Sequence, residues 1–244
     1  MDEMIELVKN GYTLKIYKDK LELSSAVFKF IASHIIDKIK KKDRFKFCVS
    51  GGSTPKSVYE LLSNSDLRWD MVDVFLGDER CVDPNSELSN SLMLKNSLLT
   101  NFGSKAFFYE IFNDPKADDE EIKNLFISKL FEKCGSTPPS FDLTLLGLGD
   151  DGHTASLFPY QKNNIDDIVI FNEGKGLKRI SLTPKVLSAS TEIVFLVSGS
   201  SKKLALERLL DEMESPDRTP SKLIKSINQI SIFCDQESAK ELKI

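Results

Sequence analysis

The sequence predicts an α/β fold with a Rossmann-like, mostly parallel central sheet and helices on both faces. Short β-rich runs alternate along the chain with segments in which apolar residues recur every three or four positions. That alternation is typical of parallel strands joined by crossover helices. Loops rich in glycine and serine follow several of the runs, as sharp strand-to-helix connections require. With 244 residues, of which 41% are hydrophobic, the chain can bury a large core, and we expect one domain over residues 1–244.

The individual elements follow from local pattern. Strands are predicted at residues 45–49, 72–76, 141–146, 179–182, 193–197 and 230–234. The first helix is predicted from the apolar positions between Leu23 and Ile39, and its lysine-rich end suits the helix dipole. Further helices are predicted at residues 55–63, 90–99, 120–132, 202–214 and 221–227. The polar segments 113–121 and 161–167 are expected to be surface loops.

Charge and hydropathy exclude several classes of protein. The 33 Lys and Arg against 37 Asp and Glu give a formal net charge of −4, which excludes a strongly basic nucleic-acid binder but not a local pocket for an anion. No apolar run approaches the ~20 residues of a membrane span. Residues 1–4 lack the basic and apolar regions of a signal peptide. We therefore expect a cytoplasmic protein with neither nucleic-acid nor membrane partners.

The cysteines carry no sign of a metal site or of a disulfide framework. Cys48, Cys81, Cys134 and Cys234 lie far apart, and no Cys-x-x-Cys occurs. Two of them fall inside strand-like runs, where a buried thiol behaves as a small apolar residue. We expect reduced thiols.

Ligands of a parallel sheet bind at the carboxyl ends of its strands, so the loops there are the first place to look for a site. The loop after the run 45–49 comprises Ser50, Gly51, Gly52, Ser53 and Thr54. Its glycines permit a sharp turn close to a ligand, and Ser53 or Thr54 followed by Pro55 suits the start of a helix. Free N–H groups at such a start favour a phosphate. The same residues fit a plain strand–turn–helix joint equally well.

Two further loops carry charges that suit an anionic ligand. Asp78, Glu79 and Arg80 follow the run 72–76, and Arg80 could pair with a phosphate or a carboxylate. For Asp78 and Glu79 an internal ion-pair network is at least as good an explanation. Lys202 lies at the start of a predicted helix, where its positive charge opposes the helix dipole. A lysine at this unfavourable position indicates that it binds an anion; the alternative is an ordinary surface lysine.

The loop after the run 141–146 contains both a decoy and a candidate base. Gly147, Gly149 and Gly152 spell the dinucleotide fingerprint Gly-x-Gly-x-x-Gly, but the two aspartates between them would repel a pyrophosphate, and we reject NAD binding. His153 follows directly. A neutral imidazole, with an ordinary pKa near 6.5, is well matched to act as a base near pH 7.

The rest of the sequence excludes some classes of enzyme but does not identify the reaction. The other histidine, His34, falls in the first amphipathic helix and is expected to be structural. Neither Gly-x-Ser-x-Gly nor His-Glu-x-x-His occurs, so serine-hydrolase and zinc-protease chemistry lack support. The residues alone therefore indicate an enzyme that acts on a phosphorylated small molecule.

In their order along the chain, these loops resemble those of the 6-phosphogluconolactonase family. Matching blocks lie at residues 50–55, 77–80, 89–90, 147–159, 179–183, 199–202 and 220–224. The most specific is Asp-Gly-His-Thr-Ala-Ser-Leu-Phe-Pro at 151–159, which lacks the Asn-Glu pair typical of the related glucosamine-6-phosphate deaminases. Asp150 stands where the family more often has a proline. The resemblance implies a glucosamine-6-phosphate deaminase-like fold over nearly the whole chain.

The resemblance also implies a reaction, the hydrolysis of the phosphosugar lactone 6-phospho-D-glucono-1,5-lactone to 6-phospho-D-gluconate in the pentose phosphate pathway. It makes His153 and Asp151 catalytic, and it implies neither a metal nor a cofactor. The substrate and its phosphate would be held by Ser50, Gly51, Gly52, Ser53, Thr54, Arg80, Gly152, Arg179 and Lys202. Backbone N–H groups of residues 149–153 are the expected oxyanion donors.

Two alternatives to the lactonase stay open, an aminosugar-phosphate deaminase or isomerase and a non-catalytic phosphosugar-binding regulator. We expect a monomer or a weak dimer.

Overall fold

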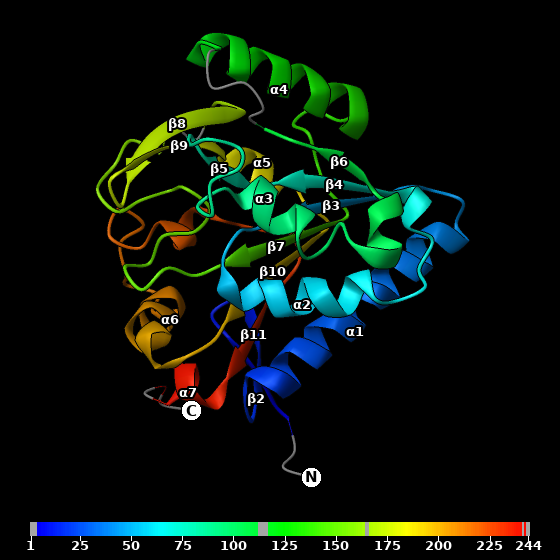
Figure 1. Cartoon of the computed structure of the whole chain (residues 1–244). Helices are drawn as coiled ribbons and strands as arrows, with labels where there is room; N and C mark the ends of the chain where they lie inside the picture. Colours follow the sequence, from blue (N-terminus) through cyan, green and yellow to red (C-terminus); the bar gives the residue numbers. More distant parts are fainter. Residues whose placement is uncertain (1–3, 112–116, 164–165, 241, 243–244) are drawn as a thin grey trace.

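The computed structural model describes residues 4–111, 117–163, 166–240 and 242, and within them it contains a large central sheet flanked by helices (Figure 1). The eight strands of that sheet are, in spatial order, β1 (Ile5–Lys9), β2 (Tyr12–Tyr17), β11 (Ile230–Asp235), β10 (Glu192–Val197), β7 (Leu143–Gly147), β3 (Phe45–Val49), β4 (Val72–Leu76) and β6 (Phe107–Tyr109). Only β1 pairs antiparallel, with β2; every other neighbouring pair is parallel. The predicted mostly parallel sheet is confirmed.

A second, three-stranded antiparallel sheet lies beyond the central one. Its strands, in order, are β5 (Asp78–Arg80), β9 (Leu177–Leu182) and β8 (Val169–Gly174). The predicted strand at 179–182 therefore exists but lies outside the central sheet, because it pairs with β5 and β8 instead. The two sheets join at Gly77, whose N–H donates to the carbonyl of Val49 at 2.9 Å and whose carbonyl accepts from the N–H of Leu182 at 2.8 Å.

The described helices are mostly those that the apolar pattern predicts. They are α1 (Lys20–Lys40), α2 (Ser53–Ser63), α3 (Asn90–Lys95), α4 (Asp119–Cys134), α5 (Pro184–Ser188), α6 (Lys203–Leu210) and α7 (Gln236–Ala239), with 3₁₀ helices η1 (Trp69–Met71), η2 (Asn101–Lys105), η3 (Ser200–Lys202) and η4 (Pro220–Leu223). Asp19 begins α1 by accepting from the N–H groups of Leu21 and Glu22. Gly135, with a φ of 65°, ends α4 in the left-handed conformation.

The prediction of a helix at 221–227 is wrong, and the one at 202–214 is too long. The buried ammonium of Lys222 explains part of both errors, because it donates to the carbonyls of Leu209, at 3.4 Å, and Asp211. It thereby satisfies carbonyl groups at the end of α6, which stops at Leu210. After η4 the chain is already extended at Ile224. The predicted helix at 90–99 likewise ends early, at Lys95.

The two predicted loops fall partly outside the described residues, which omit 112–116 and 164–165. For residues 119–121 the loop prediction is wrong, since they form the first turn of α4. Asp118 caps that turn by accepting from the N–H of Glu121 at 2.8 Å, and the acidic residues beside it favour a helix start.

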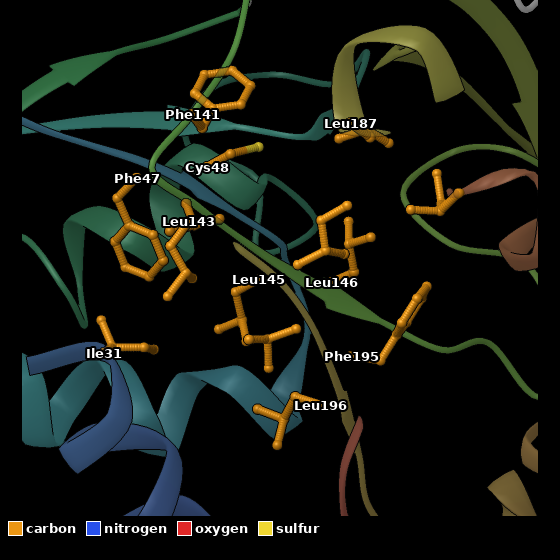
Figure 2. Close-up of a cluster of buried hydrophobic side chains, with 14 of the residues drawn as sticks. Ile31, Phe47, Cys48, Phe141, Leu143, Leu145, Leu146, Leu187, Phe195 and Leu196 are labelled. Atoms are coloured by element: carbon orange, nitrogen blue, oxygen red, sulfur yellow. The ribbon is translucent and has the colours of Figure 1, made fainter. Parts of the chain in front are cut away.

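Helices cover both faces of the central sheet, as predicted. In Figure 2, Phe47, Leu143 and Leu145 point toward Ile31 of α1, whereas Cys48 and Leu146 lie on the opposite face, toward Leu187 of α5. All five residues of β4 are buried. The four cysteines are free, and three of them are buried. None of the described helices is long and apolar enough to cross a membrane.

The strand order reverses between β3 and β7. From β3 the chain proceeds outward to β4 and β6, whereas β7, β10 and β11 lie on the other side. A parallel sheet opens a crevice beyond the carboxyl ends of its strands at such a reversal. The loops singled out in the sequence all leave the sheet at this edge.

Candidate active site

A cavity of about 240 Å³ lies at the point where the strand order reverses. It is lined by the loops that follow β3, β4, β7 and β10, together with the turn between β8 and β9. The predicted site residues on its wall are Ser50, Gly51, Gly52, Ser53, Thr54, Arg80, His153, Arg179 and Lys202. The other two predicted site residues, Asp151 and Gly152, do not line it.

The loop after β3 presents a helix start that no side chain caps within the described structure. Gly52 occupies the position before α2 with a φ of 110°, which a residue with a side chain rarely adopts. The expected capping by Ser53 or Thr54 is therefore wrong, because the helix already begins at Ser53, and Pro55 is its third residue. The N–H groups of the first turn remain available to an anion.

Two neighbours of this helix start have different roles. The buried hydroxyl of Ser50 has no hydrogen-bond partner among the described residues, although Ser50 lines the cavity. Gly51 is required by packing, since a Cβ there would lie 1.9 Å from the side-chain oxygen of Asn90. Ser50 is thus the group of this pair that is free to bind a ligand.

The acidic pair after β4 is hydrogen-bonded within the protein, as the network alternative expects, although Asp78 also lines the cavity. The buried carboxylate of Glu79 accepts from the N–H groups of Arg80, Asn90 and Ser91, each at 2.7 Å. Asp78 accepts from the hydroxyl of Ser156 at 2.6 Å. Both carboxylates hold the loops around the cavity in place.

Arg80 is tethered but not fully satisfied. Its Nη1 donates to the carbonyl of Leu88, whereas its buried Nε has no partner in the described part of the chain. A buried donor without an acceptor is costly. Arg80 lines the cavity, so an anion bound there could accept this hydrogen bond.

The glycine-rich loop after β7 folds back on itself. The N–H of Gly149 donates to the carbonyl of His153 at 2.8 Å, and that of Gly152 donates to the carbonyl of Gly149 at 3.0 Å. These groups, with the N–H of His153 that donates to Asp151, are not free to stabilise an oxyanion, and the expectation is wrong for them. No helix begins in the described residues 148–163, so the helix start that the dinucleotide fingerprint needs is missing.

His153, on the cavity wall, forms a hydrogen-bonded pair with Asp151, which does not line the cavity. Nδ1 of the imidazole makes a short hydrogen bond to the carboxylate, and the backbone N–H of His153 donates to the same oxygen at 3.1 Å. Burial raises the pKa of Asp151, but the hydrogen bond and the charge of His153 outweigh it and hold that pKa well below its usual range. An ionised Asp151 accepts a hydrogen bond from Nδ1–H, so the proton of the neutral ring stays on Nδ1 and the lone pair is on Nε2.

Phe158 contacts both the imidazole and a guanidinium. Its ring centroid lies 4.8 Å from that of His153 and 5.3 Å from Cζ of Arg179. Nε of Arg179 donates to the carbonyl of Gly174 at 3.1 Å. Burial lowers the pKa of Arg179, and the nearby charge of Arg80 lowers it further. The two guanidiniums therefore repel each other, which an anion in the cavity would relieve.

Lys202 reaches the cavity from the loop after β10. The buried carboxylate of Asp235 fixes that loop by accepting from the hydroxyl of Ser198 at 2.5 Å and from the N–H of Gly199 at 3.0 Å. Burial lowers the pKa of Lys202, and the charge of Lys175 also lowers it. No ion pair to Lys202 is present among the described residues.

Sequence reasoning missed Lys175, Asn90 and Phe158, although Lys175 and Asn90 line the cavity and Phe158 packs on His153. The signal for Lys175 was Gly-Lys-Gly at 174–176, a turn between two β-rich runs. Within the described ranges, no group of three or more His, Cys, Asp or Glu side chains is arranged to hold a metal ion.

Comparisons with known proteins agree with this geometry. A family model described as glucosamine-6-phosphate isomerases/6-phosphogluconolactonase matches residues 18–232. A 6-phosphogluconolactonase of Nostoc sp. is 29% identical over 238 residues, which cover 95% of this chain and 99% of that protein. A probable 6-phosphogluconolactonase of Dictyostelium discoideum is 33% identical over 234 residues, covering 90% and 95%.

The same relationship holds in three dimensions. The crystal structure of a 6-phosphogluconolactonase from Thermotoga maritima matches with a TM-score of 0.79 at 26% identity, covering 91% of this chain and 98% of that one. The fold is therefore that of these enzymes, as the resemblance implied. The chain belongs to the family of glucosamine-6-phosphate isomerases and 6-phosphogluconolactonases, and it is an enzyme.

Proposed function

We propose that this enzyme hydrolyses 6-phospho-D-glucono-1,5-lactone to 6-phospho-D-gluconate, with His153 as the general base. The observation that carries the proposal is the hydrogen bond between Asp151 and Nδ1 of His153 at the wall of a cavity lined by cationic side chains. The relatives named 6-phosphogluconolactonase support the choice of substrate.

The first step is the attack of water on the lactone carbonyl. Nε2 of His153 takes a proton from the water as its oxygen bonds to C1, and the electrons of the carbonyl move onto its oxygen. Asp151 holds the ring in the required tautomer and stabilises the imidazolium that forms. An ionised Asp151 suits this role.

The second step opens the ring. The tetrahedral intermediate collapses, the bond between C1 and the ring oxygen breaks, and the imidazolium of His153 gives its proton to that oxygen. The carboxylic acid formed at C1 then loses a proton to solvent. His153 returns to its neutral form, ready for the next water.

The cations on the cavity wall suit the 6-phosphate. Arg80, Arg179 and Lys202 surround a space of about 240 Å³, and the start of α2 with the unpartnered hydroxyl of Ser50 adds neutral donors. A dianion offers several acceptors to these groups and offsets their mutual repulsion. Fixing the phosphate orients C1 toward the base.

The test is the disappearance of 6-phosphogluconolactone, generated in situ, with the spontaneous rate subtracted and EDTA present. We expect His153→Ala to lower kcat roughly 10²–10⁴-fold, the usual contribution of a general base, while 6-phosphogluconate still binds. His34→Ala is the matched control, because His34 lies in α1, does not line the cavity, and its Nδ1 bonds to the carbonyl of Phe30 at 2.8 Å. It should keep the wild-type rate.

The remaining outcomes separate the alternatives. Equal turnover by wild type and His153→Ala removes His153 from the mechanism. No acceleration by the wild type overturns the lactonase, and release of ammonia from glucosamine 6-phosphate would then show a deaminase. Binding of phosphosugar without any turnover would indicate a regulator.

A further inference from the structure

The turn between β8 and β9 brings an additional cation to the cavity. Gly174 pairs with Leu177 at the end of the ladder, which leaves Lys175 and Gly176 as a two-residue turn. Both have positive φ, 52° and 75°, as the common tight hairpin turn requires. Lys175 lines the cavity opposite the loops of the central sheet. No step described above uses it.

Lys175 is paired with Asp150 in this structure. Its Nζ lies 3.1 Å from Oδ1 of Asp150, and the two side chains are 51% and 58% exposed. Ion pairs this exposed stabilise a protein little, because water competes for both charges. The pair can therefore open at small cost.

The position of the pair links it to the rest of the site. Asp150 directly precedes Asp151, the partner of His153. The charge of Lys175 lowers the pKa of both Asp151 and Lys202, which places its ammonium within electrostatic reach of the partner of His153 and of Lys202. The two ammonium groups that face the cavity repel each other, and the carboxylate of Asp150 offsets this repulsion by acting on both. A phosphate bound between them could take over that role.

We propose that Lys175 is a further substrate-binding residue, which leaves Asp150 when substrate enters and binds the 6-phosphate together with Lys202. This inference rests on the proposed function, since it concerns the same site and substrate. The exchange is favourable because the phosphate dianion replaces a single exposed carboxylate as partner of the ammonium. The released carboxylate of Asp150 remains in water and is solvated.

The phosphate, rather than the lactone ring, is the group that Lys175 selects. The hydroxyl and carbonyl groups of the ring are neutral and compete poorly with Asp150 for an ammonium. Loss of Lys175 should therefore weaken binding of the phosphorylated substrate and spare its unphosphorylated analogue. That difference is the measurable signature of the proposal.

The experiment compares Lys175→Met with wild type on 6-phosphogluconolactone and on D-glucono-1,5-lactone. We expect KM for the phosphorylated lactone to rise about 10-fold with kcat within about 2-fold, and kcat/KM for the unphosphorylated lactone to stay unchanged. Lys178→Met is the matched control, because Lys178 leaves the same hairpin, pairs with Asp119 at 2.6 Å and does not line the cavity. It should behave as wild type.

Asp150→Asn tests the exchange itself. Removing the competing carboxylate should lower KM about 2–3-fold when Lys175 is present and have a clearly smaller effect in the Lys175→Met background, where the charge of Asp150 still acts on Lys202. An equal effect in both backgrounds would show that the two residues act independently and would overturn the exchange.

The readouts keep this inference separate from the proposed function. Calorimetry with 6-phosphogluconate needs no turnover, and Lys175→Met should raise its Kd about 10-fold even if lactone hydrolysis were absent. An unchanged Kd, or equal losses with the phosphorylated and unphosphorylated lactones, overturns the role of Lys175. An inactive wild type with a normal calorimetric difference overturns only the lactonase.

Discussion

The hydrogen bond between His153 and Asp151 has room to form because residue 149 is a glycine. A Cβ on Gly149 would lie 2.0 Å from Nδ1 of His153 and 2.6 Å from Oδ1 of Asp151. A Cβ does not approach a non-bonded heavy atom that closely, so the imidazole or the carboxylate would have to move. The hydrogen bond that fixes the tautomer depends on this glycine.

We therefore expect Gly149→Ala to lower kcat at least about 100-fold without unfolding the protein, a loss comparable to that of a misdirected general base. Gly147→Ala is the control for structure, because a Cβ at Gly147 meets nothing within 4 Å. The measurements are kcat and the NMR signals of the imidazole protons. The signal of His34 serves as an internal reference for that of His153. An unshifted His153 signal in Gly149→Ala would contradict the prediction.

At the residue scale, residue type alone predicted much of the site. It did not predict which residues face the cavity and which hold the surrounding loops. Arg80 and His153 were found because a cation or an imidazole at a strand end has few structural uses. Glu79 remained ambiguous, because only the positions of its three N–H donors show that it holds a loop. Lys175 was missed because nothing local shows that its hairpin folds over the carboxyl edge of another sheet.

Burial and length separate the elements that could be predicted from those that could not. The run 72–76 is buried at every position and reads as a strand without ambiguity. The strands β5 and β6 have three residues each, too few to show a period, and β1 exposes most of its side chains. The false helix at 221–227 has a helical composition that the tertiary contacts of Lys222 override.

At the scale of the elements, the hydrogen bonds between the end of β11 and the loop after β10 position Lys202. Asp235 ends β11, caps α7 through the N–H of Ser238 at 2.9 Å and holds Ser198 and Gly199. Burial raises the pKa of Asp235, but these hydrogen bonds outweigh it and keep that pKa below its usual value. The carboxylate is thus ionised when it holds the loop.

We expect Asp235→Asn to raise KM for the lactone about 3–10-fold with kcat within about 2-fold, because an amide satisfies fewer N–H and O–H donors than a carboxylate. Ser198→Ala, which removes one of these bonds, should give a smaller change in the same direction. Steady-state kinetics at saturating and limiting substrate measure both. A fall in kcat with unchanged KM would show that the loop serves the reacting end of the substrate instead.

At the scale of the whole molecule, a segment after α6 packs against the glycine-rich loop that carries His153. Thr219 packs against Gly152, where a Cβ would come within 3.0 Å of its methyl group, and the hydroxyl of Thr219 donates to the buried Glu214 at 2.7 Å. The hydrogen bond from Arg218 is the largest cause that lowers the pKa of Glu214, to about 2, although burial acts in the opposite direction. A carboxyl group whose pKa is lower in the folded than in the unfolded chain stabilises the fold. That stabilisation is complete at pH values above the pKa that the group has in the unfolded chain.

The contribution of Glu214 should therefore be complete above about pH 4.5 and disappear as the pH falls toward about 2. Arg218→Met should lower the free energy of unfolding slightly at pH 7, because Arg218 is exposed and water screens its charge. Urea unfolding of both proteins between pH 7 and pH 2 measures the difference, which should shrink over that window. A difference that grows as the pH falls would contradict the assignment.

Lys40→Met provides the comparison, since Lys40 and its partner Asp37 are both largely exposed. Its unfolding free energy should differ little from that of the wild type throughout the same range.

The pairing of β2 with β11 joins segments of sequence more than two hundred residues apart. During synthesis at about 5–20 residues per second, Tyr12, Leu14 and Ile16 leave the ribosome roughly 10–40 s before their partners. Throughout that interval the β1–β2 hairpin has an open edge and apolar side chains that the finished protein buries. We therefore expect the hairpin to be open to chaperone binding or to non-native strand pairing until residues 230–235 emerge.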